Sequence, residues 1–165
     1  MGTSFSVPLK KLVKELSLEV VYMSEHSTER VIESTDVNRP GLNLTGFFQY
    51  FDSKRVQIMG RMEFAYLETL LEEERKKRIF EMFALKFPCV IISRGMEIFP
   101  EVLEAAQQND IVVLRTSEST SSILSNVITF LNVELAPRIT RHGVLIEIYG
   151  EGVLLLGDSG VGKSE

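Results

Sequence analysis

Apolar residues recur along the chain at two spacings, one typical of helices and one typical of strands. Helical spacing predicts helices over residues 9–16, 63–83, 99–110 and 123–135. Short runs rich in β-branched residues predict strands at 18–23, 55–60, 89–94 and 111–116. Such alternation with short connections is typical of layered α/β domains in which some strands are parallel. The pattern therefore predicts a mixed sheet flanked by helices, within a domain spanning residues 1–135.

The segment 63–83 has the pattern of one long surface helix. Phe64, Leu67 and Leu71 fall on one face of it. The stretch EEERKKR (72–78) places acidic residues four positions before basic ones, the better orientation for helix pairs. The expected pairs are Glu72–Lys76, Glu73–Lys77 and Glu74–Arg78. This pattern favours a solvated helix face over a binding patch.

Local signals mark several element boundaries. A Pro-Gly turn opens the segment RPGLNLTGFF (39–48), and Pro100 suits the first turn of a helix. The hydroxyl-rich stretch SESTSS (117–122) supplies side chains that cap a helix N-terminus. Pro137 stops the last helix of the domain, and charged residues replace the apolar stripe. We therefore predict a linker at 136–142.

A second unit is expected to begin at residue 143. The runs VLIEIY and VLLLG read as two strands joined by the turn Gly150–Glu151–Gly152, which favours an antiparallel hairpin. The second strand leads directly into a glycine-rich loop. Residues 143–165 are therefore interpreted as the beginning of a further domain.

Composition narrows the function classes. The chain has 165 residues, 18 basic against 23 acidic, which gives a net charge of −5 and argues against a nucleic-acid binder with a broad basic face. Its one cysteine, Cys89, excludes an intrachain disulfide and fits a reducing cytoplasm. No apolar run approaches the roughly 18 residues of a membrane span, and the N-terminus lacks the features of a signal peptide. We expect a cytoplasmic protein without membrane or nucleic-acid partners.

The glycine-rich loop matches the phosphate-binding pattern G-x-x-x-x-G-K-[ST]. Glycines let successive backbone N–H groups approach phosphate oxygens, the lysine reaches the outer phosphates, and the serine hydroxyl ligates Mg²⁺. A chance match in a chain of this length has odds of roughly one in a few hundred. The predicted nucleotide-binding residues are Gly157, Asp158, Ser159, Gly160, Val161, Gly162, Lys163 and Ser164, with Ser164 as the metal ligand.

The remaining candidate residues carry weaker signals. Asp158 stands among groups that donate to anions, so it is expected to shape the loop rather than contact phosphate. On spacing alone, His142 in the linker is more often incidental than functional. Cys89 opens a buried-type strand and reads as a core thiol, and His26 lies in a polar loop with no assigned role. One cysteine and two scattered histidines do not make a zinc site.

Three segments together carry a resemblance to a known family. RPGLNLTGFF, RVQIMGRMEFAYL and LAPRITRHGVLIEIYGEGVLLLGDSGVGKSE resemble the bacterial HPr kinase/phosphorylase family, over about Arg39 to Glu165. That family uses ATP or pyrophosphate to phosphorylate a serine of HPr, the phosphocarrier of the sugar phosphotransferase system, and reverses the reaction by phosphorolysis. The resemblance implies a Mg²⁺-dependent homohexamer that acts in carbon catabolite regulation. It also implies a Mur-ligase-like N-terminal domain and a catalytic domain similar to phosphoenolpyruvate carboxykinase.

Carried over by position, the resemblance assigns roles to individual residues. His142 matches the family's catalytic histidine, Lys163 its catalytic loop lysine, and Gly157–Ser164 its ATP loop. The family continues past the position of Glu165 with an aspartate base, a further metal ligand and the helices that contact HPr. We therefore expect the 165-residue chain alone to lack activity and to bind ATP weakly.

Two other interpretations remain open at this point. Residues 1–135 could form a regulatory module that binds a metabolite or a nucleotide sugar, although fold analogy is a weak warrant for that. A different P-loop kinase or GTPase would fit the loop, but not the hairpin before it or RPGLNLTGFF.

Overall fold

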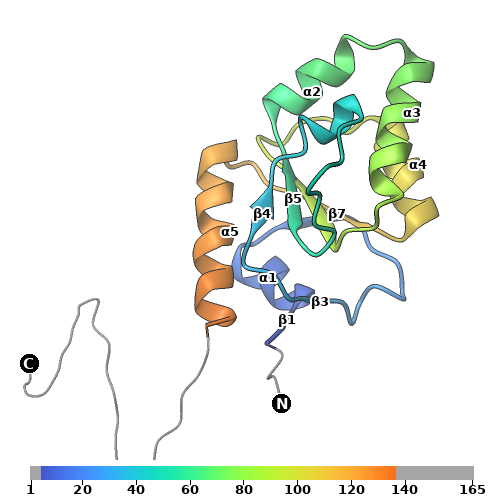
Figure 1. Ribbon diagram of the computed structural model, residues 1–165. Coiled ribbons are helices and arrows are strands. Elements are labelled where there is room, and N and C mark those ends of the chain that lie inside the picture. The colour runs from blue at the N-terminus through green and yellow to red at the C-terminus, as the bar shows by residue number, and fades with distance from the viewer. Residues whose placement is uncertain (1–4, 137–165) are drawn as a thin grey trace, which may run out of the picture.

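The computed structural model describes residues 5–136 (Figure 1). Its helices are α1 (Leu9–Glu15), α2 (Arg61–Glu68), α3 (Glu72–Phe83), α4 (Pro100–Asn109) and α5 (Thr120–Glu134), with the 3-10 turn η1 (Asn43–Thr45). Its strands are β1 (Val7–Pro8), β2 (Glu19–Tyr22), β3 (Val31–Ile32), β4 (Val37–Asn38), β5 (Val56–Met59), β6 (Cys89–Ile92) and β7 (Val112–Arg115).

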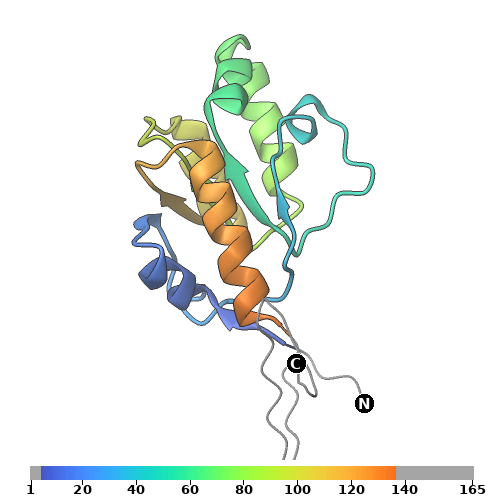
Figure 2. The same cartoon turned by 90° about the vertical axis from the view of Figure 1, so that its left-hand side faces the viewer.

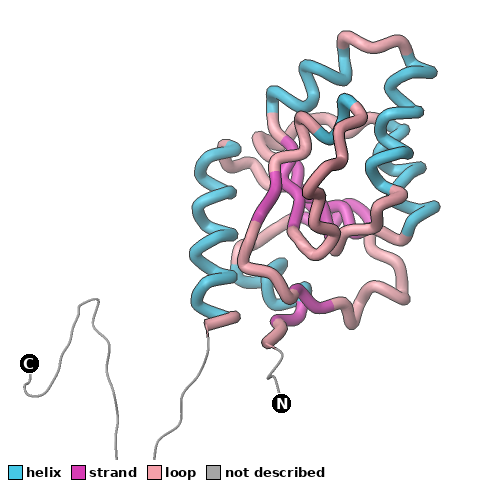
Figure 3. Tube along the Cα trace, viewed as in Figure 1, coloured by secondary structure: helices cyan, strands magenta, loops and turns pink. Residues whose placement is uncertain are grey.

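The main sheet is mixed, as the sequence pattern predicts. Its strand order is β2-β7-β6-β5-β4, in which β4 to β7 run parallel and β2 pairs antiparallel with β7. The strands β1 and β3 form a separate antiparallel pair. Figure 3 shows the loops that join these short strands to the helices. Because β4 to β7 share one direction, all their carboxyl ends lie at one edge of the sheet and all their amino ends at the other.

Side chains of the central strands enter two separate cores. Successive strand residues point to opposite faces, so Ile58, Ile91 and Leu114 pack with one cluster. Their neighbours Met59 and Val90 pack with the other. Every residue of β5 and β6 is buried. Burial on both faces is the expected condition of a parallel sheet whose crossover connections are helices.

Each face of the sheet is covered by its own set of helices. Helix α5 and the N-terminal segment with α1 lie on one face, and α2, α3 and α4 lie on the other (Figures 1 and 2). Helix α5 contacts β4 and β5. Its buried positions Ile123, Val127 and Leu131 recur at helical spacing, so one stripe of the helix faces the sheet. Its N-cap Ser119 accepts a hydrogen bond from the amide of Ser122 at 3.2 Å, as the hydroxyl-rich stretch predicts.

The single helix expected over 63–83 is wrong. Helix α2 ends at Glu68, and Leu71 is the extended N-cap residue of α3, with its side chain 82% exposed. Three acidic residues, Glu72 to Glu74, form the first turn of α3. Carboxylates stabilise the positive N-terminal end of a helix. The acidic run therefore lies at the start of a second helix and not in the middle of one long helix.

The three expected ion pairs of α3 are also only partly correct. Arg78 pairs with Glu74 at 2.8 Å. Lys76 pairs instead with Glu104 of α4 at 3.7 Å. Glu72 to Glu74 lie at the start of the helix, where their charges interact with the positive end of the helix dipole. Among residues 5–136, only one of the three expected intrahelical pairs forms.

Candidate functional site

All the site residues predicted from the sequence lie outside the described residues. These are His142, Gly157, Asp158, Ser159, Gly160, Val161, Gly162, Lys163 and Ser164. The described residues nearest to them in sequence are at the end of α5. There Leu131 and Leu135 are buried in the core shared with α1, and Lys11 donates a hydrogen bond to Glu134 at 2.9 Å. The helix that precedes the predicted site is therefore anchored to its own domain up to its last turn.

The carboxyl edge of the sheet is where open α/β sheets commonly bind ligands. Here an ion pair between Arg39 and the buried Glu63 occupies part of it. Glu63 of α2 is 3% exposed and accepts two hydrogen bonds from Arg39, at 2.8 and 3.0 Å. The same carboxylate accepts the backbone N–H of Gly60 at 2.8 Å, which caps the start of α2. Every oxygen of the buried carboxylate therefore has a donor, as a buried charge requires.

A second buried contact closes the same edge beside the ion pair. The hydroxyls of Ser93, after β6, and Thr120, at the start of α5, are hydrogen-bonded at 2.6 Å. Thr120 lies directly against Gly60, so that a Cβ atom on Gly60 would overlap its hydroxyl oxygen. The start of α5, the end of β5 and the end of β6 thus meet without room between them. This part of the edge holds the fold together.

Beyond β7 the carboxyl edge has a shallow pocket of about 430 Å³ lined in part by Glu19 and Arg115. Arg115 donates two hydrogen bonds to Glu19, at 2.8 and 3.0 Å, and one to the carbonyl of Met96 at 3.1 Å. The hydrogen bond from Arg115 lowers the pKa of the Glu19 carboxyl. Both charged groups are satisfied by each other, so this pocket offers a ligand little unpaired charge.

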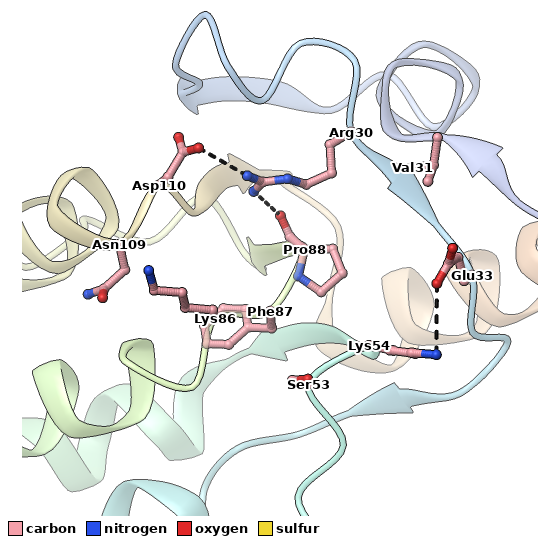
Figure 4. Close-up of a pocket in the computed structure, with 10 residues that line it drawn as sticks. All are labelled: Arg30, Val31, Glu33, Ser53, Lys54, Lys86, Phe87, Pro88, Asn109 and Asp110. Carbon is pink, nitrogen blue, oxygen red and sulfur yellow. Dashed lines mark hydrogen bonds and ion pairs between the residues drawn. The ribbon is translucent and has the colours of Figure 1, made fainter.

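The amino edge of the sheet carries an open cavity of similar size, about 450 Å³ (Figure 4). Its walls come from β3 and the residues beside it and from the segments just before β5, β6 and β7. Its charged lining residues are Arg30, Glu33, Lys54, Lys86 and Asp110. None of these residues is among the site residues predicted from the sequence. A signal was available, because Arg30, Lys54 and Lys86 each stand one to three positions before a strand.

Cys89 is buried in β6, as its place in an apolar run predicts. Burial raises the pKa of its thiol to about 12, and the charge of Arg30 opposes this only in part. At neutral pH the side chain is a protonated core thiol. Cysteine nucleophiles require a lowered pKa and an accessible sulfur, so Cys89 has neither property of a reactive cysteine.

Because the pKa of the Cys89 thiol is raised in the folded state, we predict that the stability of the domain depends on pH. The unfolded thiol ionises near pH 8.5, whereas the folded thiol keeps its proton until about pH 12. Rising pH therefore favours the unfolded state. Between pH 7.5 and 9.5, the ionisation of this cysteine in the unfolded state should lower the free energy of unfolding by about 1.4 kcal/mol. Urea unfolding at both pH values, compared between the wild-type chain and Cys89→Ala, measures this. An equal pH-dependent loss in both proteins would contradict it.

Within residues 5–136, no group of three or more His, Cys, Asp or Glu side chains lies together in a way that could hold a metal ion. None of the helices in the same range has the length and apolar character needed to cross a membrane.

The fold is found in a solved structure. The chain is similar to the structure entitled "Crystal structure of the CBS and DRTGG domains of the regulatory region of Clostridium perfringens pyrophosphatase complexed with activator, diadenosine tetraphosphate". The TM-score is 0.55 at 20% sequence identity, over 84% of this chain and 53% of the other. At this identity the likeness concerns the fold alone.

Comparison of sequences gives the family. A family profile described as HPr Serine kinase N terminus matches residues 7–131, and one described as HPr Serine kinase C-terminal domain matches residues 133–165. The chain is 49% identical over 161 residues to HPr kinase/phosphorylase of Caldicellulosiruptor bescii, and 43% identical over 160 residues to that of Streptococcus thermophilus. Each alignment takes in 97–98% of this chain and 52% of the relative, so the chain spans about half the length of these relatives. The chain belongs to the HPr serine kinase family.

Proposed function

We propose that this chain forms the N-terminal part of a bifunctional kinase/phosphorylase that acts on a serine of the phosphocarrier HPr. One observation carries the proposal. The profile described as HPr Serine kinase C-terminal domain matches residues 133–165, which contain both His142 and the whole phosphate-binding pattern. ATP or pyrophosphate would supply the phosphoryl group, and inorganic phosphate would remove it again by phosphorolysis. Relatives named HPr kinase/phosphorylase support both directions.

The chemistry of the loop residues fits a Mg²⁺–nucleotide complex. Gly157, Gly160 and Gly162 lack side chains that would keep phosphate oxygens from the backbone N–H groups. Lys163 would neutralise charge on the outer phosphates, and the hydroxyl of Ser164 would hold the metal ion. Mg²⁺ would neutralise phosphate charge in the transition state. Asp158, Ser159 and Val161 would complete the loop through their backbone groups.

His142 is proposed as the second catalytic residue of the chain. In the family resemblance it matches a histidine that stabilises charge on the phosphoryl group or on an aspartate base. A positioned donor of this kind lowers the barrier by interacting more strongly with the transition state than with the substrate. The aspartate and a further metal ligand are not among these 165 residues, so we expect the chain assayed alone to leave HPr unphosphorylated.

The finer features of the family are proposed along with the activity. Residues 1–135 would form a domain similar to one in the Mur ligases, residues 136–142 a linker, and residues 143–165 the opening of a catalytic domain similar to phosphoenolpyruvate carboxykinase. The protein would act in the cytoplasm, as a homohexamer, in carbon catabolite regulation. The family membership and the α/β fold support these features.

Substitution of the two proposed catalytic residues tests the function. In a full-length protein that contains this sequence, Lys163→Ala and His142→Ala should each slow HPr phosphorylation and phosphorolysis by about 100-fold, because each removes transition-state charge stabilisation. Phosphorylated HPr and released pyrophosphate are the readouts. Lys14→Ala, an exposed lysine at the end of α1, is the matched control and should be fully active. Unchanged rates in both directions for His142→Ala would remove that residue from the mechanism.

A further inference from the structure

The cavity at the amino edge has no part in the proposed phosphoryl transfer. Its residues come from β3 and the residues beside it and from the segments that precede β5, β6 and β7, so the fold itself brings them together. Its volume of about 450 Å³ is within the usual range for small-molecule sites. Figure 4 shows the side chains of Arg30 and Lys86 on one side of the cavity and the pair Lys54 and Glu33 on the other.

One side of the cavity is fixed by hydrogen bonds. Arg30 donates to the carbonyl of Pro88 at 3.1 Å and to the carboxylate of Asp110 at 3.2 Å. The hydroxyl of Ser24 also donates to Asp110. The guanidinium and the carboxylate therefore satisfy each other, and their positions are set before any ligand arrives. Such preorganisation reduces the entropy that a ligand must overcome on binding.

The charges around the cavity do not balance. Three cationic side chains, Arg30, Lys54 and Lys86, face two carboxylates, Glu33 and Asp110. Arg30 pairs with Asp110, and Lys54 lies 3.9 Å from Glu33, at the outer limit of an ion pair. Among residues 5–136 no hydrogen bond or ion pair of the Lys86 side chain is present. The cavity therefore carries one excess positive charge in a chain whose net charge is −5.

The backbone conformation of Lys86 limits which substitutions can test its role. Its φ angle is +59°, and that of Asp110 is +58°. This left-handed conformation favours glycine, because other residues pay a steric cost of about 1 kcal/mol in it. At Asp110 the cost is offset by the bonds that its carboxylate accepts from Arg30 and Ser24. Lys86 lies just past the C-cap Ala84 of α3, and its amide donates to the carbonyl of Phe83 at 3.1 Å, so the helix end accounts for the conformation and any substitute here must tolerate it.

A simpler explanation for a lysine at position 86 is that its ammonium group is solvated by water and interacts with the ends of nearby helices. Lys86 follows the C-terminus of α3, and the C-terminus of α4 lies at the same edge. A lysine near the negative end of a helix stabilises that helix. This explanation predicts that Lys86 contributes to stability and to nothing else, and it can be separated by experiment from a binding role.

We propose that the amino-edge cavity is a binding site for a small organic anion. The anionic group pairs with the ammonium of Lys86, beside the fixed pair of Arg30 and Asp110. The apolar part of the ligand lies against the side chains of Val31 and Pro88, which also line the cavity. The proposal does not depend on the phosphoryl-transfer function, since its residues and those of the phosphate loop do not overlap.

Phenyl phosphate is a suitable probe, and phenol is the matched probe without the anion. In the 165-residue chain, NMR titration with phenyl phosphate should give saturable shifts at the amides of Val31, Lys86, Phe87 and Asp110, and phenol should not. Lys163→Ala should bind the probe at these amides as the wild type does, which separates this site from the phosphate loop. Saturation is expected at millimolar concentrations, as for a ligand with few contacts.

Variants of Lys86 decide between the two roles. Lys86→Gly removes the charge and suits the positive φ, so the protein should stay folded while the dissociation constant rises about five-fold, the worth of one partly exposed ion pair. Lys86→Arg should bind as the wild type does. Lys86→Asn, which also tolerates this conformation, repeats the test without glycine's added flexibility. Equal binding by Lys86→Gly and wild type, a response to phenol equal to that to phenyl phosphate, or no saturable shift up to about 20 mM would each overturn the proposal.

Discussion

Gly60→Ala is expected to destabilise the domain by about 4 kcal/mol. The new Cβ atom would overlap the hydroxyl oxygen of Thr120 and lie 3.0 Å from its Cγ2 and 3.1 Å from its Cβ. Thr120 cannot move aside freely, because it begins α5 and its hydroxyl is bonded to the buried Ser93. Overpacking a core costs about 1–3 kcal/mol, and loss of a buried hydrogen bond adds about 1–3 kcal/mol. Urea unfolding of the 165-residue chain measures the loss.

Gly41→Ala is the matched control for this substitution. A Cβ atom there would meet only the side chain of Glu63, at 3.7 Å and beyond, which is ordinary contact. Its unfolding free energy should change by less than about 1 kcal/mol. Thr120→Ala should recover part of the stability in a Gly60→Ala background, because it removes the overlapping atom. If Gly60→Ala and Gly41→Ala unfold at the same urea concentration, the close approach of α5 to β5 is wrong.

Arg39→Ala should cost about 3 kcal/mol, since it strips a buried carboxylate of its cation. Glu63 is 3% exposed and would keep only the Gly60 amide as a donor. Removing one partner of a buried ion pair costs about 3–5 kcal/mol, and the lower end applies because the Arg39 side chain is itself 36% exposed. Chemical unfolding of Arg39→Ala against the wild type gives the value.

The double variant Arg39→Met with Glu63→Leu distinguishes a lost pair from lost packing. Apolar replacement of both partners leaves no isolated charge, so it should be less damaging than Arg39→Ala alone. Arg61→Ala, an exposed arginine in the first turn of α2, should change stability by less than about 0.5 kcal/mol. A double variant that is less stable than Arg39→Ala would mean that packing, not charge, dominates at this position.

Elements with local signals were predicted well from the sequence. Helix α1 follows the apolar spacing of residues 9–16, α4 begins at Pro100, and α5 begins after the hydroxyl of Ser119. Each of these signals acts within a few residues of its own position. The mixed sheet was predicted because strands and helices alternate along the chain.

Features that depend on distant partners were not predicted. The strands β1, β3 and β4 have two residues each, too short for any periodicity, and only their pairing defines them. Gln57 stands at the polar position of the alternating run RVQIMG but is fully buried. The amides of Asn38 and Gln57 hydrogen-bond at 2.7 Å across the β4–β5 pair, and Asn38 lies well before Gln57 in the sequence. The alternation of apolar and polar residues therefore predicted the strand, but not that the face carrying Gln57 is buried.

The two candidate sites differ in the same way. The phosphate loop is a contiguous pattern from Gly157 to Ser164, so the sequence alone predicts it. The amino-edge cavity is assembled from residues as far apart as Arg30 and Asp110, and no contiguous stretch of the sequence contains it. Lys54 and Lys86 each stand shortly before a strand. This position indicates that they share an edge of the sheet only once β5 and β6 are known to be parallel.

The positions of the two ends of the domain bear on how such a domain can be joined to other domains. Strand β1 and the end of α5 lie at the same pole of the domain (Figure 1), where Lys11 of α1 bonds Glu134. A unit whose ends emerge together can be joined to different neighbours, or moved between genes, without threading its chain through them. The same fold within the regulatory region of a pyrophosphatase fits such modular use. The contacts of Gly60 with Glu63 and Thr120 lie inside the domain, so they do not depend on what its two ends are joined to.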